Sequence, residues 1–243
     1  MIVGVLLTLA VFVFVVGVGH KVIQYTLTPA PLKVPTTPAP TTRSGVVWRM
    51  LKEVVLFESL FKASKFTWVF GWLFHAGLLV TLLCHLRYFT EPVWGWVIWL
   101  TPFSRLAAQV MLAGLIGLLV RRVFVDRVRA ISAPSDYLML VHIILIGGSG
   151  FSMRYLAPAD IYVVNQFALG LLKLEFLSLN NNFLLLLHLT LVAALLIIFP
   201  FSKLLHAPGL FFSPARYQID NSREKRHVGK TATQQKPAER TDG

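Results

Sequence analysis

Long apolar runs without charges dominate the pattern of hydrophobic and polar positions. Five of them approach or exceed the length of about 20 residues that a helix needs to cross the hydrocarbon core of a bilayer. They are Ile2–Gly19, Thr67–Arg87, Leu106–Val123, Tyr137–Met153 and Phe183–Phe201. The runs are continuous rather than alternating, and lipid offers backbone amides and carbonyls no partner. The pattern therefore predicts an all-α integral membrane protein, a bundle of five transmembrane helices.

Composition agrees with this prediction. Of the 243 residues, 56% are hydrophobic and 14% are charged, and the mean hydropathy is +0.67, whereas a soluble domain is about 25% charged. The first run has no basic segment before it and no small-residue cleavage pattern after it, which favours a retained helix over a signal peptide. The single cysteine, Cys84, excludes a disulfide framework, a cysteine-rich zinc site and an iron–sulfur cluster held by this chain alone.

Basic residues predict the orientation. Most of the 23 Lys and Arg residues lie between the first and second runs, between the third and fourth, and after the fifth. The positive-inside rule then places the N-terminus outside and the C-terminus in the cytoplasm. A basic rim beside anionic lipid accounts for the net charge of +12 without a nucleic-acid partner.

The chain divides into four parts on this pattern. Residues 1–19 form the first transmembrane helix, and residues 67–206 form a core of four helices. Between them, residues 20–66 hold a Pro/Thr-rich linker, "TPAPLKVPTTPAPTTRSG", and an amphipathic helix. This helix lies either on the membrane surface or beneath a partner subunit. Residues 207–243 form a cytoplasmic tail, which is expected to be disordered from about Tyr217.

Four of the seven histidines form a pattern across two predicted spans. His75 and His85 lie in the second run, and His188 and His206 bracket the fifth. Because these spans run antiparallel, depth pairs His85 with His188 and His75 with His206. Two facing imidazoles can bind the iron of a b-type haem from both sides, and no Cys-x-x-Cys-His motif for covalent attachment is present. The pattern predicts two haems b, with these four histidines as iron ligands.

The spacing of these histidines raises one difficulty. On a continuous helix, eighteen residues bring His188 and His206 back to about the same face. They also separate the two by about 27 Å, against about 15 Å between His75 and His85. Tilt and a break at Pro200 would reduce this mismatch. His142, at a depth similar to that of His75, remains the alternative partner.

The same residues resemble a known family. The histidine spacing, the "FPFSKLLH" that closes the fifth run and the "RRVFVDRVRA" after the third are similar to the cytochrome b (gamma) subunit of respiratory nitrate reductase. The resemblance covers roughly residues 66–214. It implies five spans with the N-terminus outside, a cytoplasmic-side haem on His75 and His206, and an outer haem on His85 and His188.

Two further stretches are similar to one branch of that family. They are residues 34–65 and "HAPGLFFSP" (206–214), and the branch is DsrM, the membrane cytochrome b of the complex associated with dissimilatory sulfite reductase. This resemblance implies a prokaryotic cytoplasmic-membrane protein that exchanges electrons with the quinone pool. It also implies a cytoplasmic iron–sulfur partner resembling heterodisulfide reductase, further membrane subunits, and a role in dissimilatory sulfur metabolism.

Quinone chemistry needs groups that move protons. Arg105 stands where gamma chains carry a basic residue implicated in quinol binding, although it also suits an interfacial anchor. The other candidates are Glu91 and Asp160 toward the outside, and His142 and Asp136 toward the cytoplasm. Candidate hydrogen-bond partners for the ligand imidazoles are Ser149, Ser152 and Thr190. Alternative functions are a haem-free membrane anchor or assembly subunit, and a nitrate reductase gamma subunit proper.

Overall fold

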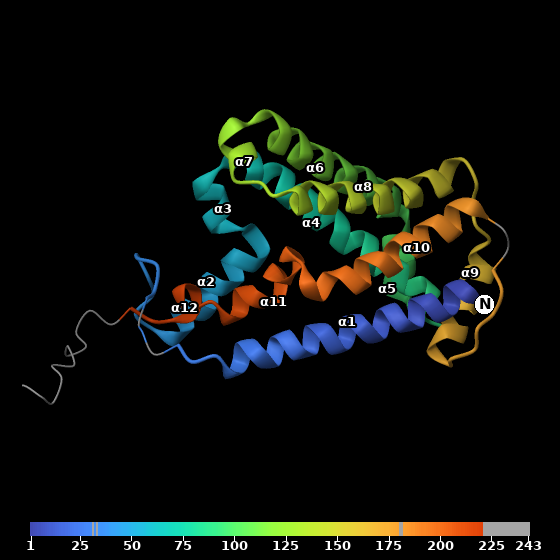
Figure 1. The fold of residues 1–243 in the computed structure, drawn as a ribbon, viewed down its shortest axis with the longest axis horizontal. Helices are drawn as coiled ribbons and strands as arrows, with labels where there is room; N and C mark the ends of the chain where they lie inside the picture. Colours follow the sequence, from blue (N-terminus) through green and yellow to red (C-terminus); the bar gives the residue numbers. More distant parts are fainter. Residues whose placement is uncertain (31, 33, 180–181, 221–243) are drawn as a thin grey trace, which may run out of the picture.

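The computed structural model describes residues 1–30, 32, 34–179 and 182–220. Within these residues the regular structure is entirely helical, as predicted (Figure 1). The helices in chain order are α1 (Ile2–Leu27), α2 (Arg43–Leu56), α3 (Glu58–Ala63), α4 (Lys65–His85), α5 (Gly95–Leu100), α6 (Ser104–Phe124), α7 (Asp126–Ala130), α8 (Pro134–Tyr155), α9 (Ile161–Leu172), α10 (Phe183–Ile198), α11 (His206–Gly209) and α12 (Pro214–Tyr217).

Five segments are long and apolar enough to cross a membrane: Ile2–Leu27, Lys65–Tyr88, Gly95–Phe124, Pro134–Tyr155 and Phe183–Phe201. They correspond to the five runs of the sequence, so the predicted five-helix membrane fold is confirmed. The first helix continues to Leu27, beyond the predicted end at Gly19. The third span begins earlier than predicted because α5 and a 3-10 turn precede α6. The chain is a multi-pass membrane protein.

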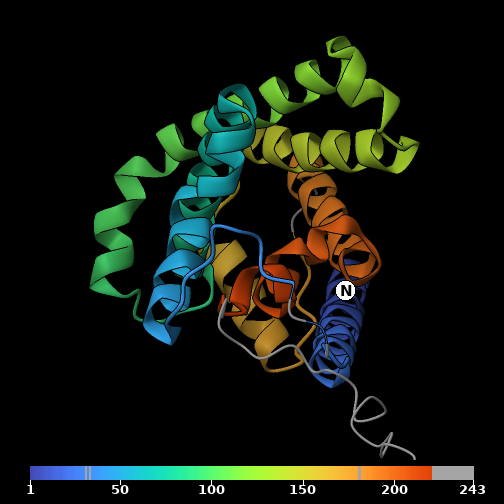
Figure 2. The ribbon, with the colours of Figure 1, turned by 90° about the vertical axis from the view of Figure 1, so that its left-hand side faces the viewer.

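The long helices pack in a fixed order. α4 packs against α6, α6 against α8, α8 against α10, and α10 against α1. α4 and α10 do not approach each other as these neighbouring pairs do. Viewed along the bundle, the helices form an arc in which α4 and α10 stand apart (Figure 2). These two helices carry three of the four histidines, and α11 carries the fourth.

Glycines allow the close contact between α4 and α6. A Cβ atom at Gly77 would lie 2.6 Å from the Ala107 carbonyl oxygen, and one at Gly114 would lie 2.6 Å from the Phe74 backbone nitrogen. A side chain at either position would force the backbones apart. Helices in lipid commonly associate through small residues of this kind.

The chain changes direction after α10. That helix ends at Ile198, and a 3-10 turn follows over Phe199–Phe201. Pro200 has no backbone N–H to donate the hydrogen bond that a continuing helix requires. Ser202 is extended, and a second 3-10 turn precedes α11. The break at Pro200 that would reduce the depth mismatch is therefore present. His188 and His206 do not share one continuous helix, so the helical projection that placed both on one face does not hold.

The linker and the C-terminal segment fold together at one end of the bundle, which we call the linker end. The Thr36 amide donates to the Ala215 carbonyl at 2.9 Å. Arg216 forms a 2.5 Å ion pair with the buried carboxylate of Glu53. The amphipathic helix predicted here is divided into α2 and α3 at Phe57, where φ is 52°. The predicted disordered tail falls mostly in residues 221–243, outside the described residues.

The opposite end of the bundle, which we call the α9 end, holds the N-terminus, α5 and α9 (Figure 1). α9 was not predicted from the sequence, because its apolar stretch is too short to cross a bilayer. Its Phe167 is buried against Leu7 and Ala10 of α1. Asp160 caps the N-terminus of the helix, and its carboxylate accepts from the Tyr162 amide at 2.9 Å.

Candidate cofactor site: two facing histidine pairs

At the linker side of the bundle, His75 and His206 face each other. Their ring centres are 6.1 Å apart and their ring planes are perpendicular, at 90°. His75 lies in the middle of α4, and His206 is the first residue of α11. The turn at Pro200 shortens the path from His188, which removes the depth mismatch expected for a straight helix. The rings of Phe57 and Phe74 pack edge-on against His75 at 5.0 and 4.7 Å.

Nearer the α9 end, His85 and His188 face each other. Their ring centres are 6.5 Å apart, and the rings are nearly parallel, at 18°. His85 is the last residue of α4, and His188 lies in the second turn of α10. Gly150 of α8 leaves room for this arrangement, because a Cβ atom there would lie 3.2 Å from Cε1 of His188.

Each of the four imidazoles directs Nδ1 toward a backbone carbonyl. The distances are 2.7 Å from His75 to Gly71, 2.7 Å from His85 to Thr81, 3.1 Å from His188 to Ile146 and 3.0 Å from His206 to Lys203. A proton on Nδ1 satisfies each of these carbonyls. The lone pair then lies on Nε2, which is the arrangement of a histidine that binds a metal through Nε2.

His142 makes a different contact. Its Nε2 lies 3.0 Å from the carbonyl oxygen of Leu191, so it joins α8 to α10 through the nitrogen that a ligand would need free. The ring that faces His75 belongs to His206 and not to His142.

These pairs fit the iron of a b-type haem. Iron bound at about 2.0 Å to each Nε2, which lies about 1.2 Å from its ring centre, separates two ring centres by about 6.4 Å. The measured separations are 6.1 and 6.5 Å. Across the described part of the chain, no three or more His, Cys, Asp or Glu side chains gather as a metal site. Two protein ligands suit haem, because the macrocycle supplies the other iron ligands.

Ser149 supports one of these histidines. Its hydroxyl donates to the Ile146 carbonyl at 2.9 Å, and its oxygen lies 3.0 Å from Nδ1 of His188. Ser149 is buried, so the contact is shielded from water. Of the three hydrogen-bond partners considered from the sequence, Ser149 makes this contact, whereas Thr190 donates to Leu186 of its own helix.

Asp136 is an anchor of the segment that carries His206. Its carboxylate forms ion pairs with Lys203 at 2.7 Å and with Arg122 at 3.2 Å. Lys203 lies three residues before His206, so this contact ties α8 to the turn after α10. Asp136 as a proton-transfer group stays a prediction, and its ion pairs also hold the segment that carries His206.

A cavity of about 690 Å³ lies at the α9 end. Glu91 and Arg87 line it together with Tyr162 and Asn165. Arg87 follows His85 by two residues, and the Asn165 amide donates to the Arg87 carbonyl at 3.3 Å. Arg105 is exposed at the start of α6 and does not line this cavity. Glu91 was among the residues predicted from the sequence, whereas Arg87 and Asn165 were not, because α9 was not predicted.

A family model and several relatives resemble this chain. The model described as the nitrate reductase gamma subunit matches residues 45–226. The Hdr-like menaquinol oxidoreductase cytochrome b-like subunit of Archaeoglobus fulgidus is 32% identical over 265 residues, covering 90% of this chain and 80% of that protein. Its namesake in Archaeoglobus profundus is 32% identical over 263 residues, covering 89% and 78%.

A bacterial relative is also similar. The respiratory nitrate reductase 2 gamma chain of Escherichia coli is 32% identical over 173 residues, which cover 62% of this chain and 76% of that protein. The matched part of the family model includes all four facing histidines. The chain belongs to the nitrate reductase gamma subunit family.

Proposed function

We propose that this protein is the dihaem cytochrome b subunit of a membrane respiratory complex. His75 and His206 hold one haem b, and His85 and His188 hold the other. The two centres pass electrons across the bilayer between a quinone and a soluble iron–sulfur partner. The observation that carries this proposal is the pair of ring separations, 6.1 and 6.5 Å. In each of the four imidazoles Nδ1 contacts a backbone carbonyl, which leaves Nε2 as the nitrogen with the lone pair.

The chain's own residues provide binding and orientation. When bound, haem supplies one-electron redox chemistry. The carbonyls of Gly71, Thr81 and Lys203 hold three of the imidazoles in the tautomer that binds iron. The aromatic rings of Phe57 and Phe74 limit access of water to His75.

Quinone exchange is proposed at the cavity of the α9 end. Oxidation of a hydroquinone to the quinone releases two electrons and two protons, so the site needs a base as well as an electron acceptor. Glu91 provides a carboxylate on the cavity wall, and Arg87 provides a cation two residues from His85. Arg105 does not line this cavity, so we favour Glu91 as the proton acceptor. The word menaquinol in the names of both Archaeoglobus relatives supports this class of substrate.

The iron–sulfur partner is proposed to bind at the linker end. The prefix Hdr-like in the names of the archaeal relatives supports a partner that resembles heterodisulfide reductase. Basic loops gather at this end, and the positive-inside rule places them in the cytoplasm. Electrons would then leave the haem held by His75 and His206 toward the cytoplasm. We propose that the complex serves dissimilatory sulfur metabolism.

A difference spectrum tests the proposal. The purified chain should show the α-band of reduced b-type haem and contain two haems per polypeptide. Addition of a naphthohydroquinone should reduce both centres. A protein with no haem absorption would refute the proposal and support the alternative of a haem-free anchor subunit.

A further inference from the structure

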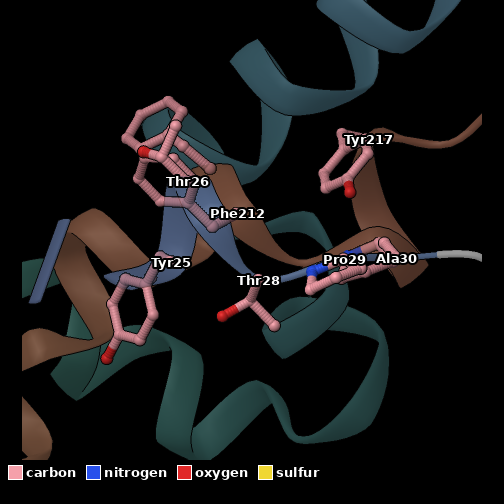
Figure 3. A pocket seen from close by; sticks show the side chains of 10 residues that line it. Tyr25, Thr26, Thr28, Pro29, Ala30, Phe212 and Tyr217 are labelled. Carbon is pink, nitrogen blue, oxygen red and sulfur yellow. The ribbon is translucent and has the colours of Figure 1, made fainter. Parts of the chain in front are cut away.

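A second cavity lies at the linker end, on the opposite side of the molecule from Glu91. Its volume is about 580 Å³, within the range of about 300–1,000 Å³ that is usual for small-molecule sites. The end of α1 provides Tyr25 and Thr28, and the segment after His206 provides Gly209, Phe212 and Tyr217. Figure 3 shows Tyr25 and Thr28 of the first segment and Phe212 and Tyr217 of the second.

The lining of this cavity is aromatic and uncharged. Four of its described lining residues carry aromatic rings, namely Tyr25, Phe211, Phe212 and Tyr217, and no lysine, arginine, aspartate or glutamate is among those described. The Tyr25 and Phe212 rings are in contact, with centres 5.9 Å apart. The described lining residues offer no cation to an anionic phosphate, so they suit a neutral ring better than a phospholipid head group. A flat neutral ring would stack on the aromatic side chains.

Hydroxyl groups can orient such a ring. The Thr28 hydroxyl donates to the Gln24 carbonyl at 2.7 Å, which leaves its oxygen as an acceptor. The hydroxyl groups of Tyr25 and Tyr217 have no hydrogen-bond partner among the described residues. A phenol can donate to the carbonyl oxygen of a quinone or accept from the hydroxyl of its reduced form. The cavity therefore combines a stacking surface with polar groups that match both redox forms.

The cavity adjoins the residue that faces His75. The helix α11 is a single turn that begins at His206 and ends at Gly209, and Gly209 lies in the cavity wall. Along the helix the two residues are separated by a rise of about 4.5 Å. A ring held against Gly209 would lie within one helical turn of His206. The end of the transmembrane helix α1 forms the other wall, so a lipid-soluble molecule can reach the cavity from the edge of the bilayer.

We propose that this cavity binds the head group of a neutral quinone beside the His75 and His206 pair. The inference rests on the proposed function, since a quinone site serves electron transfer only where haem is bound. It adds a site at the linker end to the one proposed at the α9 end.

Photolabelling with an azido-naphthoquinone tests the proposal on the haem-loaded full chain in detergent. Peptide mapping should find label in residues 25–30 and 209–217, and menadione should displace it. Gly209→Phe fills the cavity and should remove at least four-fifths of this label. Gly19→Phe is the matched control, because a Cβ atom at Gly19 meets no atom within 4 Å, and its labelling should equal that of the wild type.

The outcomes separate this inference from the proposed function. Label confined to the walls of the other cavity, residues 87–93 and 161–165, would overturn the inference while the proposed function stands. The inference would also be overturned, with the proposed function retained, if menadiol reduces the haems but no peptide is labelled. Displacement of the label by phospholipid and not by menadione would lead to the same conclusion. Failure of menadiol to reduce any haem would overturn the proposed function. If Gly209→Phe loses its haem spectrum, Tyr217→Ala replaces it, with the same loss of label expected.

Discussion

The imidazole of His206 lies perpendicular to that of His75, at 90°, whereas His188 and His85 are nearly parallel, at 18°. Axial imidazoles in parallel planes split the iron π orbitals, and perpendicular planes leave them nearly degenerate. The two proposed haems therefore differ in electronic structure although their ligands are the same residue type.

Electron paramagnetic resonance of the oxidised protein should detect this difference. We expect two low-spin ferric signals, one strongly anisotropic from the perpendicular pair and one rhombic from the parallel pair. His206→Ala should remove the anisotropic signal and leave the rhombic one. Two identical signals would contradict the assignment of the ring geometries to two haems.

Ser149→Ala should change the reduction potential of one haem. Loss of the 3.0 Å contact to Nδ1 of His188 makes that imidazole a weaker donor, which destabilises the oxidised iron and raises the potential. A hydrogen bond worth about 0.5–1.5 kcal/mol corresponds to a rise of about 20–65 mV. A redox titration should find the shift only in the centre held by His85 and His188. Ser152→Ala, one helical turn away, provides the control and should leave both potentials in place.

Gly114→Ala should destabilise the bundle. The added Cβ atom would lie 2.6 Å from the Phe74 backbone nitrogen, so α4 and α6 must separate at a cost of about 1–3 kcal/mol. Gly148→Ala is the control, because a Cβ atom there meets nothing within 4 Å. Thermal unfolding in detergent should show a lower midpoint for Gly114→Ala alone. Equal midpoints for the two variants would refute the role assigned to Gly114.

Arg216→Ala should loosen the linker end. Glu53 is buried and accepts from Arg216 and Ser59, and loss of a hydrogen bond to a charged group costs about 1.5–3 kcal/mol. We expect faster proteolysis between residues 28 and 42 in this variant. Lys62→Ala breaks only the exposed pair with Glu58 and should change cleavage little. Unchanged cleavage in Arg216→Ala would show that the pair does not hold the linker.

The sequence predicted the membrane helices well, because length and hydropathy are sufficient to identify a span. It predicted which histidines face each other from depth alone. It indicated a break at Pro200 as a way for His206 to approach His75, and that break is present. It did not predict the path of the chain after the break, since a helical projection assumes a straight helix. Composition and periodicity treat each segment separately, so they also missed the pairing of Glu53 with Arg216, which lie far apart in the chain.

The cavity near His85 was missed for a related reason. Its walls come from the turn after α4 and from α9, and α9 has no signal of its own in a search for spans. Glu91 was identified from its charge. The residues that line the cavity with it, Tyr162 and Asn165, are placed there by the packing of α9.

Redox titration of single histidine variants tests the central claim most directly. His85→Ala and His188→Ala should each lose the same haem, and His75→Ala and His206→Ala should each lose the other, so every variant retains one b-type centre. His142→Ala should retain both. Loss of different centres from the two members of a pair, or loss of a centre in His142→Ala, would contradict the account.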